Sequence, residues 1–206
     1  RGSVRCVPMP NAAVNGIEIY YDDSGLPGDP TLILMAGLGG QLLNYPDEFC
    51  LAFVDRGMRV VRFDNRDAGL STHLPDGTSY TLDDMAADVL GLLDHLGVEQ
   101  AHVWGSSLGG MIAQTMAIAH PERVRSLISV QSTTGEPGVG QPDPAALAEI
   151  IESTQPASGR DEAVAKAARL YEVLQTNAAL PDPEALRIRA ESNYDRSYDP
   201  AAGARQ

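Results

Sequence analysis

The chain has 206 residues, of which 43% are hydrophobic, and a formal net charge of −13 at pH 7. A chain of this length can bury one sizeable core, and its composition is typical of a globular protein. Its acidic balance disfavours nucleic acid and anionic membrane surfaces as partners, because phosphate groups are bound by clustered Lys and Arg.

The first 130 residues contain the segments that we expect to form strands. Residues 14–21 alternate apolar and polar side chains around an Asn15-Gly16 turn, a pattern typical of a β-hairpin. Two apolar runs, at residues 31–35 and 59–63, are typical of strands buried on both faces of a parallel sheet. Two further strands are predicted at residues 101–104 and 124–130.

Predicted helices alternate with these strands. Helical spacing of apolar residues predicts one helix over residues 46–56 and another over 108–120. A third begins after Thr81, which forms a capping-box pattern with Asp84. The alternation predicts an α/β fold with a mostly parallel, doubly wound sheet that binds ligands at the carboxyl ends of its strands.

The chain changes character after the last predicted strand. Six of the ten residues from 135 to 144 are Gly or Pro, which is typical of a linker. Three amphipathic segments without a strand follow and predict a helical lid, at residues 144–153, 160–175 and 183–194. We therefore expect an α/β core at 1–134, a linker at 135–144 and a lid at 145–206.

The most informative motif is the sequence G-x-S-x-G at 105–109, between a predicted strand and a predicted helix. The flanking glycines, Gly105 and Gly109, allow a backbone turn so tight that the Ser107 side chain projects from the tip of the strand. The motif predicts that Ser107 is a nucleophile in a strained turn. The alternative interpretation is an ordinary strand-to-helix turn.

Four motifs occur in one order along the chain: PDEF at 46–49, RFDNRDAGLS at 62–71, WGSSLGG at 104–110 and AHPERV at 119–124. With them the chain resembles the α/β-hydrolase superfamily, and within it the lid-bearing serine esterases of the aclacinomycin methylesterase group. The resemblance implies ester hydrolysis, with oxyanion donors at the backbone amides of Leu108 and of Leu38, next to Gly37. Ala36 stands where many members have a histidine.

The polar residues of the 62–71 motif have a structural interpretation. We expect Asp64, Arg66 and Asp67 to hold this loop by mutual hydrogen bonds and ion pairs, and to take no part in catalysis. A serine at the elbow also argues against dehalogenase and epoxide hydrolase chemistry, because those relatives use an aspartate there.

A base for Ser107 is missing from the sequence. In this family the acid and the histidine follow the serine, and the later histidine, His120, lies about 20 Å along the predicted helix. We interpret His95, His102 and His120 as structural. His73 is the alternative base, because it is on a loop at the active face and could swing toward Ser107. The triad is therefore incomplete, and we expect residues 1–206 to be an N-terminal portion of a longer hydrolase. The last strands, the acid and the histidine would lie beyond residue 206.

Two functions remain open. The first is a serine hydrolase that cleaves a small or medium apolar carboxylic ester through a Ser107 acyl-enzyme. The second is a non-catalytic member of the fold that binds a small molecule or a protein. Thioester, lactone, perhydrolysis and carbon–carbon bond chemistry are not separated from ester chemistry by these motifs.

The remaining expectations concern partners and location. Cys6 and Cys50 lie in neither a CxxC nor a metal-ligand spacing, so we expect free thiols, no metal and no cofactor. Free thiols favour a reducing compartment and a cytoplasmic location. The strand at 124–130 would form an unpaired sheet edge, through which we expect the chain to associate with itself.

Overall fold

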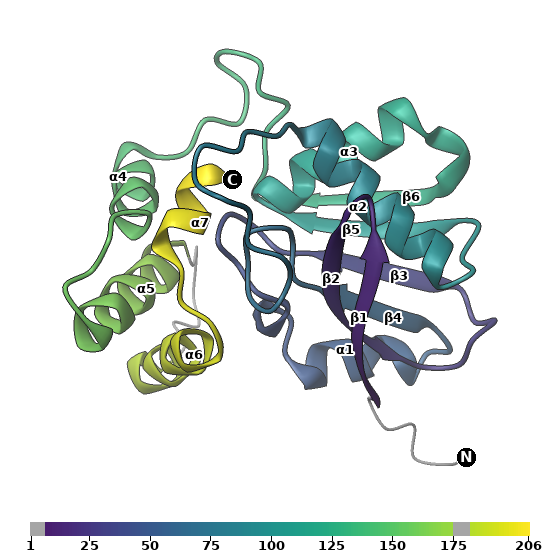
Figure 1. Ribbon diagram of the computed structural model, residues 1–206, viewed down its shortest axis with the longest axis horizontal. Helices are drawn as coiled ribbons and strands as arrows, with labels where there is room; N and C mark the ends of the chain where they lie inside the picture. The colour runs from purple at the N-terminus through teal and green to yellow at the C-terminus, as the bar shows by residue number, and fades with distance from the viewer. Residues whose placement is uncertain (1–6, 175–181) are drawn as a thin grey trace.

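The computed structural model describes residues 7–174 and 182–206, and it contains one mixed sheet flanked by helices (Figure 1). The order of its strands is β1-β2-β4-β3-β5-β6. β1 and β2 are antiparallel to their neighbours, whereas β3, β4, β5 and β6 are parallel. The predicted α/β fold with a mostly parallel, doubly wound sheet is confirmed. The strands are Val7–Val14, Ile17–Ser24, Thr31–Met35, Arg59–Phe63, Ala101–Ser106 and Val124–Val130.

β1 and β2 form the predicted hairpin, and both strands are longer than the alternating pattern indicated. Asn15 and Gly16 have positive φ angles of 47° and 78°. Such angles at both central residues produce a tight turn whose twist matches the flanking strands. The hairpin packs on α2, since a Cβ added to Gly91 of that helix would lie 2.9 Å from the Cβ of Val14.

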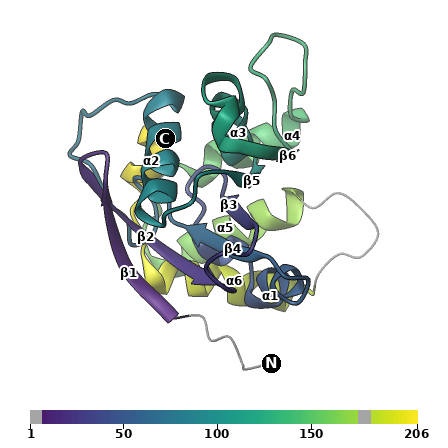
Figure 2. The same cartoon turned by 90° about the vertical axis from the view of Figure 1, so that its right-hand side faces the viewer.

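Helices cover both faces of the sheet, as Figures 1 and 2 show. α2 (Leu82–His95) and α3 (Leu108–Ala119) pack on one face over a buried apolar cluster that includes Ile33, Phe63 and Val103. α1 (Asp47–Val54) covers the opposite face, where Phe49 and Phe53 pack against Trp104 at ring-centroid distances of 5.4 and 6.2 Å. All five residues of β3 and all five of β4 are buried because each strand is covered from both sides.

The start of α2 confirms the predicted capping box. The Thr81 hydroxyl accepts from the Asp84 N–H at 3.3 Å, and the Asp84 carboxylate accepts from the Thr81 N–H at 2.8 Å. These bonds satisfy backbone donors that the first turn of a helix leaves free.

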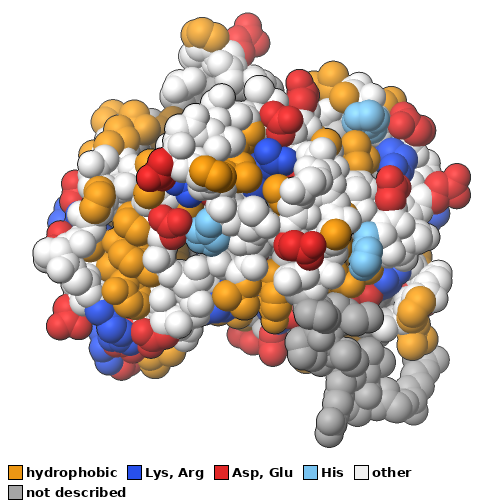
Figure 3. All heavy atoms as spheres, viewed as in Figure 1, with side chains coloured by type: hydrophobic (Ala, Val, Ile, Leu, Met, Phe, Trp, Pro, Cys, Tyr) orange, Lys and Arg blue, Asp and Glu red, His pale blue; other side chains and the backbone are white. Residues whose placement is uncertain are grey.

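Residues 131–143 contain no helix or strand, and helices follow them. α4 packs on α5 and α5 on α6, and all lie beyond one end of the sheet strands (Figure 1). Apolar side chains are exposed in this region (Figure 3), among them Leu147 and Ile151 of α4. A further short helix, α7, was not predicted. The bounds are Pro144–Ser153 for α4, Arg160–Leu174 for α5, Pro183–Arg196 for α6 and Pro200–Arg205 for α7; residue 175 of the predicted helix lies outside the described residues.

Two short 3₁₀ helices, η1 (Leu42–Asn44) and η2 (Pro121–Arg123), complete the described elements. None of the helices in the described ranges combines the length and the apolar character that crossing a bilayer requires. Cys50 is buried and forms no disulfide within the described residues, and its Sγ donates to the Tyr45 carbonyl at 3.8 Å. Cys6 lies outside the described residues.

β6 is the last strand in the described sheet, and Leu127 on it is 40% exposed. An edge strand presents unpaired N–H and C=O groups that can template pairing with another chain. We expect residues 1–206, made alone, to form oligomers or aggregates that static light scattering detects. Leu127→Lys should reduce this association, because a charge on an edge strand opposes pairing. A monodisperse monomer of the unmodified chain would contradict the prediction.

Candidate active site

Ser107 occupies the junction between β5 and α3 with a φ of 54° and a ψ of −119°. A residue other than glycine in such a backbone conformation costs on the order of 1–3 kcal/mol, so its surroundings must hold it in place. The Ser107 N–H donates to the Val130 carbonyl at 2.9 Å, and the Ser132 hydroxyl donates to the Ser107 carbonyl at 2.8 Å. The strained turn predicted for Ser107 is confirmed.

The two glycines of the motif are required by close backbone contacts. A Cβ added to Gly105 would lie 2.0 Å from the Gly109 carbonyl oxygen, and one added to Gly109 would lie 2.2 Å from the Met35 carbonyl oxygen. Non-bonded carbon and oxygen atoms do not approach this closely. Glycine at both positions therefore lets α3 begin directly against the ends of β5 and β3, which fixes the direction in which Ser107 leaves the strand.

The loop after β3, at residues 36–41, lies against Ser107. A Cβ added to Gly37 would be 3.1 Å from the Ser107 Cβ and 3.7 Å from its Oγ. The Gly40 N–H donates to the Gly37 carbonyl at 2.9 Å, which closes a turn. Because C=O and N–H point in opposite directions in a trans peptide, the Leu38 N–H points away from Gly40.

The Leu108 amide is the first of α3, and the first amides of a helix have no acceptor within the helix. Leu108 directly follows Ser107, and Leu38 directly follows the glycine that packs against it. The structure therefore places the segment with Gly37 and Leu38 next to the segment with Ser107 and Leu108. The role of the two leucine amides as oxyanion donors stays a prediction.

Three side chains hold the 36–41 loop in the absence of a histidine at position 36. The Asn65 Nδ2 donates to the Ala36 carbonyl at 3.1 Å, and the Tyr45 hydroxyl donates to the Met35 carbonyl at 2.8 Å. The Gly39 N–H donates to the Gln206 side-chain oxygen at 2.7 Å. Burial raises the pKa of Tyr45, so its hydroxyl stays a donor. These three residues could not be predicted from the sequence. They bond to backbone groups, and no sequence motif marks which side chain will reach a given backbone group.

The polar residues of the 62–71 motif hold the loops, as predicted, but their partners differ from the prediction. Arg66 forms a two-pronged ion pair with Asp88 of α2 at 2.6 and 2.7 Å, instead of pairing with an acid of its own loop. Asp67 binds Arg205 of α7 at 2.8 Å. The expected mutual pairing is wrong, because the charged partners of Arg66 and Asp67 come from α2 and α7, which pack on this loop.

The four histidines lie within the described residues, and none forms a hydrogen bond with Ser107 there. His102 contacts the Ser126 hydroxyl at 2.7 Å, and His95 contacts the Tyr21 hydroxyl at 3.4 Å. His120 lies at the end of α3, 3.7 Å from Glu122.

His73 forms a pair with an acid, but it is not arranged as a base. Its Nδ1 lies 2.8 Å from the Asp199 carboxylate and its Nε2 lies 3.0 Å from the Gly69 carbonyl. Both partners are acceptors, so the ring must donate from both nitrogens, as only the imidazolium does. Burial alone lowers the pKa of His73, but its bonds to Asp199 and Gly69 outweigh that effect and raise the pKa above its ordinary value. A ring protonated in this way cannot accept the serine proton.

This pair predicts a pH-dependent contribution to stability. Because the pKa of His73 is raised on folding, the contribution is complete below its unfolded pKa of about 6.5 and is lost as the pH rises through the folded pKa. The pKa of Asp199 changes in the opposite direction: burial raises it, but the bonds from His73 and the Ala202 N–H, together with the charges of His73 and Arg205, outweigh burial and lower it. The acid therefore loses its contribution only as the pH falls through its lowered pKa.

We expect His73→Asn to lower the melting temperature at pH 5.5 and to have a smaller effect at pH 9. Both side chains are about 30% exposed, at 28% and 31%, so the contribution should stay below about 1 kcal/mol. Thermal melts of the two proteins across this range measure the difference, and an effect that grows with pH would contradict the assignment.

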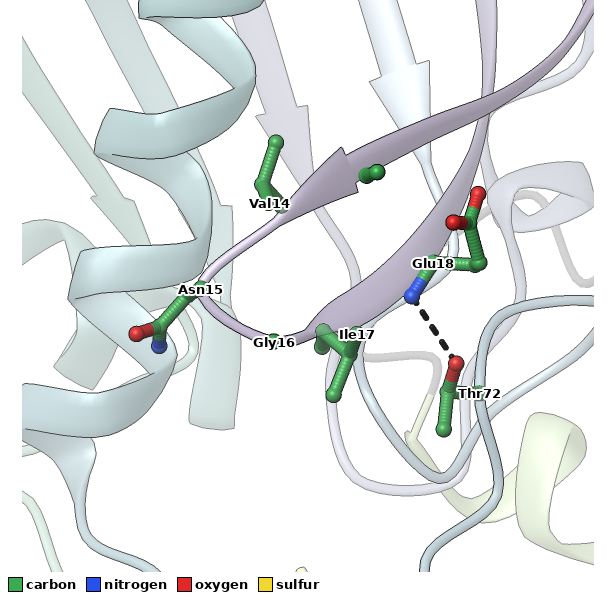
Figure 4. Close-up of a pocket in the computed structure, with 7 residues that line it drawn as sticks. Val14, Asn15, Gly16, Ile17, Glu18 and Thr72 are labelled. Atoms are coloured by element: carbon green, nitrogen blue, oxygen red, sulfur yellow. Dashed lines mark hydrogen bonds between the residues drawn. The ribbon is translucent and has the colours of Figure 1, made fainter.

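Hollows among the described residues include two that lie away from Ser107. One of about 390 Å³ lies at the hairpin turn and is lined by residues 13–18 and Thr72, whose hydroxyl accepts from the Glu18 N–H at 2.9 Å (Figure 4). The other, of about 370 Å³, lies between α5 and α6, where Arg160 and Arg187 already pair with acids of α6. Neither hollow gathers nucleophilic or metal-ligating groups, and the described residues hold no cluster of three metal-ligand side chains.

Comparison with known proteins identifies the fold family of the chain. The sequence pattern of the alpha/beta hydrolase fold family matches residues 30–180. Rhodomycin D methylesterase DnrP of Streptomyces peucetius is 38% identical over 122 residues, which is 58% of this chain and 41% of that protein. The putative carbamate hydrolase RutD of Caulobacter segnis is 35% identical over 139 residues, 66% of this chain and 48% of that protein. The matches thus span about half or less of the length of these relatives.

Solved structures share the fold. An enol-lactonase from Burkholderia xenovorans has a TM-score of 0.70 at 24% identity, with 95% of this chain and 71% of that chain covered. The meta-cleavage product hydrolase CumD from Pseudomonas fluorescens has a TM-score of 0.75 at 19% identity, with 96% of this chain and 68% of that chain covered. At these identities the likeness concerns the fold. Because the family pattern matches more than half of this chain, the chain belongs to the α/β-hydrolase fold family.

Proposed function

We propose that this chain carries the nucleophile of a serine hydrolase that acts on carboxylic esters. The observation that supports this most is Ser107, held with a φ of 54° at the junction of β5 and α3 against Gly37. A binding module needs no serine in a strained turn, so the non-catalytic alternative does not explain the backbone conformation of Ser107. The similarity to a methylesterase favours an ester as the substrate class.

The proposed reaction proceeds through an acyl-enzyme. The Ser107 hydroxyl gives its proton to a base while its oxygen attacks the ester carbonyl, and the resulting oxyanion accepts hydrogen bonds from the amides of Leu38 and Leu108. Collapse of this intermediate breaks the bond to the alkoxy oxygen, which leaves as the alcohol with the proton from the base. Water then attacks the acyl-enzyme in the same way and releases the carboxylic acid. We propose that the acid and the histidine base are supplied from outside residues 1–206.

The remaining parts of the chain have supporting roles in this proposal. Residues 1–134 form the core, 135–144 the linker and 145–206 a lid that shields a small or medium apolar ester. A cytoplasmic enzyme without a metal or cofactor fits this chemistry, which needs only the serine, its base and the amide donors.

Hydrolysis of p-nitrophenyl butyrate by a protein that contains this chain together with its base tests the proposal. Ser107→Ala should lower kcat by about 10³-fold or more, because removal of the nucleophile leaves only binding and oxyanion stabilisation. The neighbouring Ser106→Ala is the matched control and should change kcat less than about threefold. Activity that survives Ser107→Ala would contradict the nucleophile assignment.

A further inference from the structure

Residues of the lid region and of the loop beside Ser107 share one buried set of contacts. We propose that Arg196, at the end of α6, is a positioning residue for the 36–41 loop, and that it acts through Gln41 and Asp64. The consequence for catalysis rests on the proposed function, because this loop carries Leu38. The structural link itself does not depend on it.

Gln41 uses both ends of its side-chain amide on α6. It is 5% exposed. Its Nε2 donates to the carbonyls of Asn193 and Ser197 at 2.8 and 2.9 Å, and its Oε1 accepts from Arg196 Nη1 at 2.6 Å. The Asn193 carbonyl also accepts from the Ser197 N–H at 3.1 Å, so Gln41 adds a second bond there and pairs with the Ser197 carbonyl just after the end of α6.

Asp64 links the same arginine back to the loop. Its side chain is fully buried and lies 2.7 Å from Arg196 Nη2, in an ion-pair contact whose angle does not complete a hydrogen bond. One carboxylate oxygen accepts from the Leu42 N–H at 2.7 Å, and the other accepts from the Leu70 N–H at 2.9 Å. A continuous path of contacts therefore runs from Gln41 through Arg196 and Asp64 to Leu42, the next residue after Gln41.

The absence of a side chain at Gly69 leaves space for the Arg196 guanidinium. A Cβ added to Gly69, whose φ is 55°, would lie 2.2 Å from an Asp64 carboxylate oxygen and 2.6 Å from Arg196 Nη1. The Arg196 guanidinium also lies over the Tyr20 ring, 5.0 Å from its centroid. The Arg196 guanidinium thus contacts both the backbone of Gly69 and the ring of Tyr20.

Displacement of α6 would leave a buried carboxylate and a buried amide without these partners. Such groups are costly when unpaired, so the docked position of α6 and the conformation of the loop stabilise each other. The end of α6 should therefore stay on the core while α4, which has no buried side chain, moves more freely. Loss of Arg196 should loosen the turn between Gly37 and Gly40 and the Leu42 amide bond.

Amide hydrogen exchange of the 206-residue chain tests the link. In Arg196→Met, the amides of Gly40 and Leu42 should exchange at least about tenfold faster, because their bonds lose support, while β5 amides should change less than threefold. Arg187→Met on the same helix is the matched control, since Arg187 is exposed and pairs with Glu184 and Glu191. Unchanged exchange at Gly40 and Leu42 in Arg196→Met would overturn the proposal.

A second variant covers the case in which Arg196→Met does not fold. Arg196→Lys keeps a charge near Asp64 but cannot also donate to Gln41 from a planar fork, so it should speed exchange at the same two amides by a smaller factor. Ser107→Ala should leave this exchange pattern unchanged. Absence of esterase activity in the protein that carries its base would count against the proposed function alone, whereas unchanged exchange in a folded Arg196 variant would count against the positioning role alone.

Discussion

Gly105→Ala is expected to lower the free energy of unfolding by about 3 kcal/mol or more. The added Cβ would lie 2.0 Å from the Gly109 carbonyl oxygen and 2.5 Å from the Gly110 nitrogen. Both are backbone atoms at the start of α3, so no side-chain rotation can relieve the overlap, and the helix must move away from the strand. Urea unfolding followed by circular dichroism measures the loss.

Gly203→Ala is the matched control for this substitution. Gly203 lies in α7, and a Cβ there would meet no atom within 4 Å. Alanine in a helix is favoured over glycine, so this variant should be unchanged or more stable by up to about 1 kcal/mol. Equal stability of the two variants would show that α3 does not pack on β5 as closely as the structure shows.

Asp88→Ala is expected to cost about 3–5 kcal/mol of stability, because it leaves a buried guanidinium without its counter-charge. The side chains of Arg66 and Asp88 are 7% and 3% exposed, and the Asp88 carboxylate also accepts from Asn15 Nδ2 at 2.9 Å. Asp88 thus joins the loop after β4 and the hairpin to α2.

The exposed pair of Arg123 and Asp94 provides the comparison. Its carboxylate side chain is 67% exposed, so Asp94→Ala should cost less than about 1 kcal/mol. Replacing both partners of the buried pair, in Arg66→Met with Asp88→Leu, should recover part of the loss, because no charge is then left unpaired. A cost for Asp88→Ala no larger than that for Asp94→Ala would mean that the buried pair is not formed in solution.

Local sequence patterns predict the fold of this chain well, for identifiable reasons. β3 and β4 are largely apolar because both faces of each strand are covered. Thr81 and Asp84 predict the start of α2 because a capping box is a local pattern. The turn at Ser107 is predicted by the same kind of signal, since the two glycines and the serine lie within five residues. Such features depend on neighbours in the sequence.

The contacts that support the site could not be predicted in this way. Gln41 and Arg196 are 155 residues apart, and Asn65 meets the backbone of Ala36 from another strand end. Polar side chains of this kind look like surface residues in a sequence, because their burial results from the packing of α6 and the loops. The helix α7 was missed for a related reason: its six residues are too few for an apolar period, and its Arg205 docks by charge on Asp67.

Reaction with a fluorophosphonate probe, followed by mass spectrometry of the labelled peptide, tests the central claim that Ser107 is the nucleophile. We expect a single adduct on Ser107, absent in Ser107→Ala and retained in Ser106→Ala. Labelling should be slow in residues 1–206 alone, where no histidine contacts this serine among the described residues, and fast in a protein that supplies the base. An adduct on another residue, or prompt labelling that persists in Ser107→Ala, would contradict the account.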